Sequence, residues 1–186
     1  MFVDREKEVN RIIEFCKAGR PVVISSHPGL GATALLRHGV APVLREVGFI
    51  VAEFHEWQGK FFRSQLVDLI ANSVREQADQ AFLAQSETLS EMLTRIHSVT
   101  GRPVALLFDQ FEDYLRCHSG TSMSDSFDAE LSTAVLSDAS QMVVAMQDHG
   151  LRAFQRMEQF VPGLMASHHW RFMSSVAKSI IPGPVL

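Results

Sequence analysis

Hydrophobic positions along this chain follow two alternating patterns, short continuous apolar runs and longer stretches with apolar residues at helical spacing. The continuous runs predict β-strands at residues 22–25, 49–54, 104–108, 142–146 and 169–173. The stretches with helical spacing predict helices at residues 4–19, 32–44, 61–78, 86–97, 127–136 and 151–160. Strands that are apolar throughout and separated by helices favour an α/β fold, with a parallel sheet covered on both faces.

Capping residues, prolines and polar stretches refine the predicted elements. Asp4 has the side chain of a helix N-cap and is expected to begin the first helix. Pro42 lies inside the helical pattern that starts at Ala32, so we expect that helix to be kinked or divided there. The polar stretch 120–126 is expected to be the least ordered part of the chain.

Composition bounds the protein class without changing the predicted fold. The 186 residues fit one domain, and a net charge of −4 gives no support for nucleic acid as the main partner. Cys16 and Cys117 lack metal-ligand spacing and are typical of reduced cytosolic thiols. The amino terminus is charged from its fourth residue, and no apolar run approaches the ~20 residues that cross a bilayer. We therefore expect a cytoplasmic protein without membrane association.

A glycine-containing loop follows the first predicted strand and precedes a helix, which is the order of a phosphate-binding P-loop. The P-loop pattern is G-x-x-x-x-G-K-[ST], and in that register Ser26 takes the first glycine position, Gly31 the second and Thr33 the hydroxyl position. Ala32 stands where the pattern has lysine. The predicted nucleotide-contacting residues of the loop are Ser26, His27, Pro28, Gly29, Leu30, Gly31, Ala32, Thr33 and Ala34.

Two acidic residues follow the third predicted strand, Asp109 at its end and Glu112 three residues later. In a P-loop NTPase an acid at this strand end holds magnesium, and a nearby acid can polarise the attacking water. We therefore predict Thr33 and Asp109 as ligands of Mg²⁺, and Glu112 and Asp109 as the catalytic residues. The alternative is that Asp109 caps the following helix and Glu112 is a solvated acid of its first turn.

Residues 2–8, the glycine loop, residues 108–113 and residues 162–164 together resemble the STAND branch of P-loop NTPases. More narrowly they resemble the bacterial novel STAND group, which is related to AAA+ ATPases, and Asp-Gln-Phe-Glu at 109–112 is the most specific element. The resemblance implies a three-layer fold with about five parallel strands in the order 5-1-4-3-2. It also implies ATP or GTP with magnesium and a role as a regulated switch. We place the domain at residues 1–176 and a loose tail at 177–186.

The resemblance also implies that Arg5 and Gln147 contact the nucleotide, and it exposes departures from the group's pattern. Ala32 replaces the lysine, Ser26 the first glycine and Asp4 the glycine of the amino-terminal motif, while Gln147 stands where the group has an arginine-containing sensor. Losing one charge-stabilising donor in an active site costs about 3 to 4 kcal/mol of transition-state stabilisation, and here two cationic groups are missing. We predict weak or absent binding of ATP and magnesium, and no efficient hydrolysis.

Three functions are compatible with these residues. The first is a regulatory or assembly module with a degenerate nucleotide site. The second is a working Mg-dependent ATPase or GTPase that recruits a replacement cation, such as Arg37, Arg152 or a partner's arginine. The third is a protein-interaction scaffold that holds no nucleotide. We expect protein partners, including a second copy of the chain, and not nucleic acid. The aromatic and basic residues at 57–63 form either a partner surface or a loop that enters an amphipathic helix.

Overall fold

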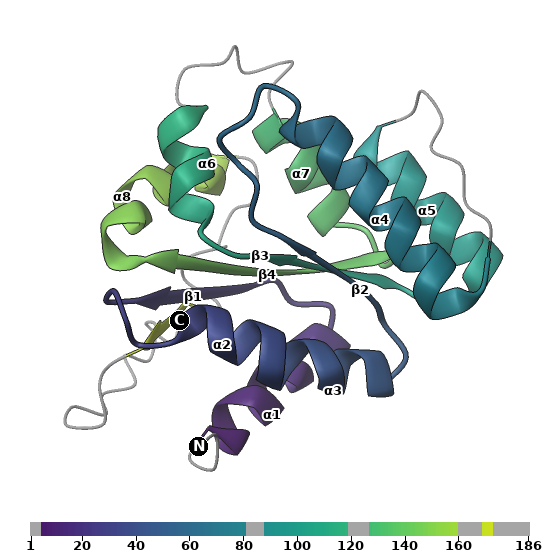
Figure 1. Ribbon diagram of the computed structural model, residues 1–186, viewed down its shortest axis with the longest axis horizontal. Coiled ribbons are helices and arrows are strands. Elements are labelled where there is room, and N and C mark those ends of the chain that lie inside the picture. Colours follow the sequence, from purple (N-terminus) through teal and green to yellow (C-terminus); the bar gives the residue numbers. More distant parts are fainter. Residues whose placement is uncertain (1–4, 81–87, 119–126, 160–168, 173–186) are drawn as a thin grey trace.

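The computed structural model describes residues 5–80, 88–118, 127–159 and 169–172. Its strands are β1 (Val22–Ser26), β2 (Ile50–Phe54), β3 (Val104–Phe108), β4 (Ser140–Gln147) and β5 (His169–Phe172). All pair in parallel, and their order in the sheet is β2-β3-β4-β1-β5 (Figure 1). The predicted α/β fold and strand order are confirmed.

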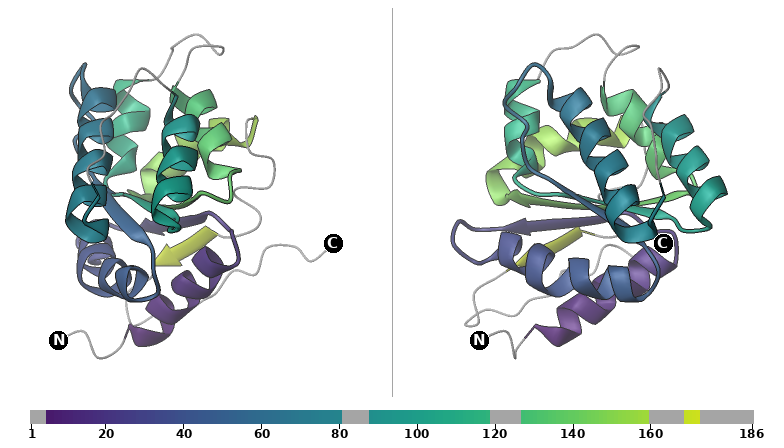
Figure 2. Two further views of the ribbon diagram at one scale, coloured as in Figure 1. Left: turned by 90° about the vertical axis from the view of Figure 1, so that its right-hand side faces the viewer. Right: turned by 45° about the vertical axis from the view of Figure 1, so that its right-hand side comes forward.

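Helices cover both faces of the sheet, as continuous apolar strands require. Figure 1 shows α1, α2 and α3 on one face and α4, α5, α6, α7 and α8 on the other, and Figure 2 shows the same three layers from two further directions. Their bounds are α1 (Glu6–Lys17), α2 (Ala32–Leu35), α3 (Ala41–Glu46), α4 (Phe62–Ala78), α5 (Leu89–Thr100), α6 (Phe111–Cys117), α7 (Phe127–Val135) and α8 (Leu151–Phe154). Shorter turns are the π-helical η1 (Leu36–Val40) and the 3₁₀ turns η2 (Asp148–Gly150) and η3 (Gln155–Gln159).

Strand β3 shows why the central strands are apolar at every position. Ala105 and Leu107 pack in the layer formed with α1, α2 and α3, whereas Val104, Leu106 and Phe108 pack in the layer formed with the helices on the other face. Successive side chains of a strand point to opposite faces, so a strand covered on both sides has no polar side. Strand β3 is therefore packed on both faces up to Asp109, the residue that follows it.

The helix predicted to begin at Ala32 is not split at Pro42, because the residues that join α2, η1 and α3 all have right-handed helical backbone angles. The proline is instead preceded by the π-helical turn η1, a local change in the helical hydrogen-bond pattern. Helix α1 packs closely against this turn at Gly39, because a Cβ there would lie 2.7 Å from Val9 Cγ2. A side chain at Gly39 would therefore separate α1 from the helix that follows the glycine loop.

Two predicted helices differ from the observed ones. The helix expected at 86–97 is α5, which begins after Thr88 because Thr88 and Glu91 form a capping box: the Glu91 N–H donates to Thr88 Oγ1 (3.3 Å), and the Thr88 N–H donates to Glu91 Oε2 (2.8 Å). The helix expected at 151–160 is shorter, with α8 continuing as η3. The expected cap Asp4, the loop 120–126, residues 162–164 and the tail 177–186 lie outside the described residues.

Strand β2 forms one edge of the sheet, and side chains cover part of that edge. The amide of Gln77, on α4, accepts a hydrogen bond from the Val51 N–H (2.9 Å) and donates one to the Val51 carbonyl (2.8 Å). Arg102 donates to the carbonyls of Gly48 (2.9 Å), Phe49 (2.8 Å) and Gln77 (2.5 Å). These bonds tie the start of β2 to the end of α4.

None of the helices within the described ranges combines the length and apolar character needed to span a membrane.

Candidate nucleotide-binding site

The glycine loop joins β1 to α2 at the carboxyl edge of the sheet. Gly29 and Gly31 have φ angles of +82° and +81°, in the left-handed region that favours glycine, so the chain turns sharply between strand and helix. The N–H of Leu35 donates to the Gly31 carbonyl (2.9 Å), which begins the helix directly after the loop. Ser26 ends β1 beside Gln147 of β4, so the strand register brings two predicted site residues together.

Ala32, Thr33 and Ala34 form the first turn after the loop and are partly buried. The methyl group of Ala32 packs against the hydrophobic layer under α1, α2 and α3. The position that carries lysine in the P-loop pattern therefore contributes apolar contact and no charge. The neighbouring Thr33 supplies the hydroxyl that the pattern places next to magnesium.

Asp109 follows β3 directly and is 8% exposed. Its backbone is fixed on both sides, because its N–H donates to the Phe54 carbonyl (2.9 Å) and its carbonyl accepts from Trp57 Nε1 (2.7 Å). Oδ1 accepts the Gln110 N–H (3.0 Å), whereas Oδ2 is buried and has no hydrogen-bond partner in the part of the chain that the structure describes. A buried carboxylate oxygen without a partner is unfavourable, and a hard cation such as Mg²⁺ would satisfy it.

The alternative role for Asp109, as a helix cap, does not match this geometry. Helix α6 begins after Gln110, and no side chain caps it. Gln110 has a φ of +53°, so the backbone turns abruptly between the strand end and the helix. The turn leaves the Asp109 side chain outside α6.

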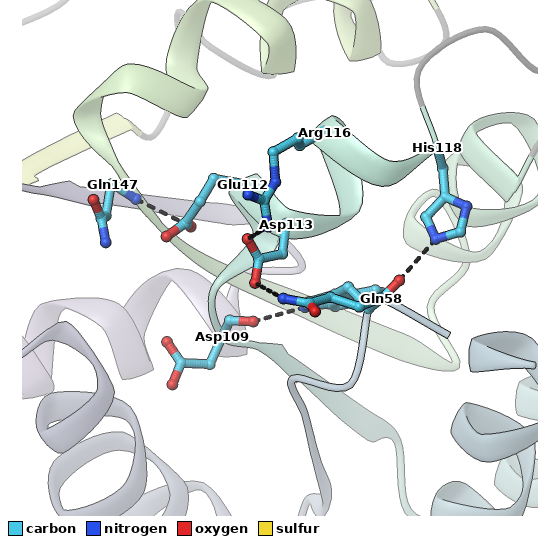
Figure 3. Close-up of polar contacts among 8 residues, drawn as sticks. Gln58, Asp109, Glu112, Asp113, Arg116, His118 and Gln147 are labelled. Atoms are coloured by element: carbon cyan, nitrogen blue, oxygen red, sulfur yellow. Dashed lines mark hydrogen bonds and ion pairs between the residues drawn. The ribbon is translucent and has the colours of Figure 1, made fainter. Parts of the chain in front are cut away.

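Glu112 lies in the first turn of α6 and is partly buried. Its Oε2 accepts a hydrogen bond from the backbone N–H of Gln147 (3.2 Å), at the carboxyl end of β4 (Figure 3). Asp113, the next residue, binds Arg116 and Gln58 instead (Figure 3). Glu112 is therefore directed toward the strand end and is not a fully solvated acid.

Charged groups around the loop differ from those expected to replace the lysine. The Arg5 guanidinium donates to the carbonyls of Leu30 (2.6 Å) and, at 3.5 Å, Gly31. His27 Nδ1 lies 3.4 Å from Asp148 Oδ2, linking the loop to the turn after β4. Arg37 in η1 and Arg152 in α8 are exposed, and among the described residues neither bonds to the loop. The structure thus places Arg5, and not the two expected candidates, at the loop.

Trp57 is a site-supporting residue that the sequence pattern did not indicate. It is fully buried, with its ring in edge contact with Phe54, Phe108 and Phe111, and its N–H holds the Asp109 carbonyl. Trp57 and Phe62 are buried, whereas Phe61 is 76% exposed. The segment 57–63 is therefore mainly a loop that enters α4, and Trp57 and Phe62 cannot form a partner surface. No spacing signal connects residues 52 positions apart, such as Trp57 and Asp109.

The chain is similar to a known protein family in sequence and to several solved proteins in fold. The family model named Novel STAND NTPase 1 matches residues 1–178. A Walker-type ATPase of Pyrococcus abyssi superposes with a TM-score of 0.61 at 15% identity, over 90% of this chain and 53% of that one. The ORC2 protein of Aeropyrum pernix, determined as ADPNP–ADP complexes, superposes with a TM-score of 0.57 at 14% identity, over 90% of this chain and 47% of that one. Cdc6p of Pyrobaculum aerophilum superposes with a TM-score of 0.54 at 10% identity, over 92% of this chain and 46% of that one.

The chain spans about half the length of these solved proteins, and identities of 10–15% show the fold alone. The comparison with curated protein sequences gave no match. The family match is more specific, because it extends from the segment around Arg5 through the glycine loop and the Asp109–Glu112 element. On this match the chain belongs to the novel STAND NTPase family.

Proposed function

We propose that this domain is a regulatory or assembly module of the STAND type, which binds magnesium nucleotide weakly and does not hydrolyse it efficiently. The observation that carries the proposal is an ordered glycine loop that presents Ala32 where the P-loop lysine is expected, at the same sheet edge as Asp109. The loop geometry favours retention of phosphate, while the missing charge opposes its activation.

Retained binding is supported by the donors around the loop. Thr33 Oγ1 and Asp109 Oδ2 would hold Mg²⁺, with phosphate oxygens completing its shell and the metal offsetting phosphate charge. Within the described ranges, no three His, Cys, Asp or Glu residues gather to hold a metal ion. A magnesium site made partly of substrate phosphate fits that donor set, because Mg²⁺ in such sites takes only one or two protein carboxylates.

Loss of efficient hydrolysis is supported by two features. Phosphoryl transfer depends on positioned charge, and neither Ala32 nor Gln147 supplies it. The carboxylate that would orient the attacking water, Glu112, already accepts the Gln147 N–H. To orient the attacking water, Glu112 would have to accept a hydrogen bond from the water in addition to the Gln147 N–H, or lose its bond to that N–H.

A second candidate, an active Mg-dependent ATPase or GTPase, is favoured by one observation, the unpartnered Oδ2 of Asp109. This oxygen suits a magnesium ion whether or not turnover follows. Turnover would then need a cation from Arg37, Arg152 or an arginine of another protein molecule, including a second copy.

Titration of the purified protein with a fluorescent ATP analogue, with and without magnesium, tests the proposal. We expect weak magnesium-dependent binding without turnover, and about tenfold or more tighter binding in Ala32→Lys. Asn10→Lys, which adds the same charge on the exposed face of α1, should bind as the original protein does.

Two results would overturn the proposal. Turnover that is lost in both Asp109→Asn and Glu112→Gln would identify an active NTPase. Absence of binding at millimolar nucleotide, in the original protein and in Ala32→Lys alike, would leave only the scaffold. Sedimentation with and without nucleotide would show whether binding changes assembly, as expected for a regulatory module.

A further inference from the structure

The Arg5 side chain contacts the backbone of the glycine loop from outside the loop. Its guanidinium donates to the Leu30 carbonyl at 2.6 Å and lies 3.5 Å from the Gly31 carbonyl. A Cβ on Gly31 would lie 3.7 Å from Arg5 Nη1, so the charged group is directly beside the loop. Arg5 immediately precedes α1, and its carbonyl accepts the Val9 N–H (3.0 Å), which anchors its backbone.

The contact with Leu30 fixes the direction of a peptide N–H. In a trans peptide the C=O of one residue and the N–H of the next point in opposite directions, and the described residues contain no cis peptide. Holding the Leu30 carbonyl therefore turns the Gly31 N–H to the side of the loop opposite the guanidinium. The Gly31 carbonyl is held in the same way, by Arg5 and by the Leu35 N–H, which directs the Ala32 N–H.

The Leu30–Gly31 peptide can rotate easily, because the residue that follows it is a glycine. Gly31 has a φ of +81° and Gly29 a φ of +82°, and glycine adopts positive and negative φ with nearly equal ease. Rotation of this peptide would exchange the outward carbonyl for the N–H. The preceding peptide, Gly29–Leu30, is held within the loop, because the Leu30 N–H donates to the His27 carbonyl (3.3 Å). The Leu30–Gly31 peptide is held through its carbonyl by Arg5 (2.6 Å), a residue 25 positions earlier in the chain.

The guanidinium also changes the charge of the loop. An arginine side chain is a cation whose charge is spread over the planar guanidinium. A cation bound to a carbonyl polarises the peptide group and strengthens its N–H as a donor. A lysine at position 32 would act directly on phosphate, whereas a guanidinium at Leu30 and Gly31 acts through the peptide groups.

We propose that Arg5 is a positioning residue of the phosphate-binding loop: it orients and polarises the N–H groups of Gly31 and Ala32 toward the phosphates of a nucleoside di- or triphosphate. This inference rests on the proposed function of the loop, and it adds a cation that acts from the outer side of the loop. It assigns Arg5 a role through the backbone, in place of the direct nucleotide contact that the family resemblance implies.

The test compares Arg5→Gln and Arg5→Lys with Lys7→Gln, which removes the same charge from an exposed position two residues away. The first readout needs no ligand: amide hydrogen exchange and NMR shifts of Gly31 and Ala32. The second is the affinity for Mg-ATP. We expect Arg5→Gln to speed exchange at Gly31 and to weaken binding about tenfold, Arg5→Lys to fall between, and Lys7→Gln to change neither.

Distinct results separate this inference from the proposed function. Equal exchange at Gly31 in Arg5→Gln and Lys7→Gln, or faster exchange with unchanged affinity, would overturn the inference and leave nucleotide binding intact. If the original protein binds no nucleotide, the proposed function fails, and the Gly31 exchange rate alone decides whether Arg5 orients the loop. Should Arg5→Gln fail to fold, Arg5→Lys keeps one donor and the same comparison applies.

Discussion

Two buried aspartates near α6, Asp109 and Asp128, are 8% and 6% exposed but have different surroundings. Asp128 has partners for both carboxylate oxygens: Oδ1 accepts the Tyr114 hydroxyl (2.5 Å), and Oδ2 lies 2.9 Å from Arg156 Nε. Asp109 uses Oδ1 for the neighbouring Gln110 N–H, and its Oδ2 has no partner among the described residues. The comparison teaches that a buried charge whose partners come from two other elements, here Tyr114 of α6 and Arg156 of η3, is part of the fold. A buried charge with one unused oxygen costs stability and is suited to a ligand.

Removing the carboxylate of Asp128, whose oxygens have partners, should have the largest effect on stability. We expect Asp128→Ala to lower the free energy of unfolding by about 3 kcal/mol, because it leaves the Arg156 charge and the Tyr114 hydroxyl without a partner. Urea unfolding followed by circular dichroism measures the change. Asp68→Ala, on the exposed face of α4, is the control and should be close to neutral. A midpoint for Asp128→Ala equal to that of Asp68→Ala would contradict the structural role.

Removing only the Tyr114 hydroxyl, which donates to Asp128, should have a smaller effect on stability. Tyr114→Phe is expected to cost about 1.5 kcal/mol, the scale of one hydrogen bond to a charged group. Arg156 would still neutralise Asp128 in this variant. A loss as large as that of Asp128→Ala would mean that the hydroxyl, and not the ion pair, dominates.

The ionisation of Tyr114 reports on the environment that Tyr114 shares with Asp128. Burial, together with the hydrogen bond to Asp128, raises the pKa of Tyr114 well above its usual value. As the pH rises above about 10, the unfolded chain loses this proton before the folded one does, so stability is unaffected below that pH and falls above it. Tyr114 is the only tyrosine, so tyrosinate absorbance reports it alone. Titration of the folded protein near pH 10 would contradict the burial.

Neutralising the unsatisfied carboxylate should have the smallest effect on stability. We expect Asp109→Asn to change the free energy of unfolding by about 0.5 kcal/mol or less, since no ion pair is broken. The same variant should lose the magnesium dependence of nucleotide binding, measured by calorimetric titration with and without the metal. Asp113→Asn is the matched control, because it removes the same charge from the adjacent helix turn. Magnesium enhancement that survives in Asp109→Asn would exclude Asp109 as the ligand.

Much of the fold could be predicted because its signals are local. Strand β3 begins and ends where the apolar run does. Strand β4 begins two residues before the predicted start because Ser140 and Gln141 are polar but buried, and Ser140 Oγ bonds to the Ala134 carbonyl (2.6 Å). A buried polar residue with a distant partner cannot be distinguished from a loop residue by hydrophobic pattern.

The candidate site was predictable only where a motif carries it. The order of loop, strand end and acids placed Gly31, Thr33 and Asp109 together at one sheet edge. The spacing of residues along the sequence does not indicate contacts between distant segments, such as the hydrogen bond from Arg5 to the Leu30 carbonyl. The buried Asp128 belongs to the fold and not to the site, and it was also not predicted, because its partners Tyr114 and Arg156 lie 14 and 28 residues away in the sequence.

The amide of Gln77 at Val51 has a consequence for how this domain meets other molecules. An added β-strand needs the outward N–H and C=O groups of an edge strand, and at Val51 both are already bonded to one side chain. A foreign strand would have to displace that amide before it could pair there. The β2 edge is thereby protected from strand addition at Val51. A partner strand that extends the sheet at Val51 would therefore lose the free energy of the two Gln77 bonds.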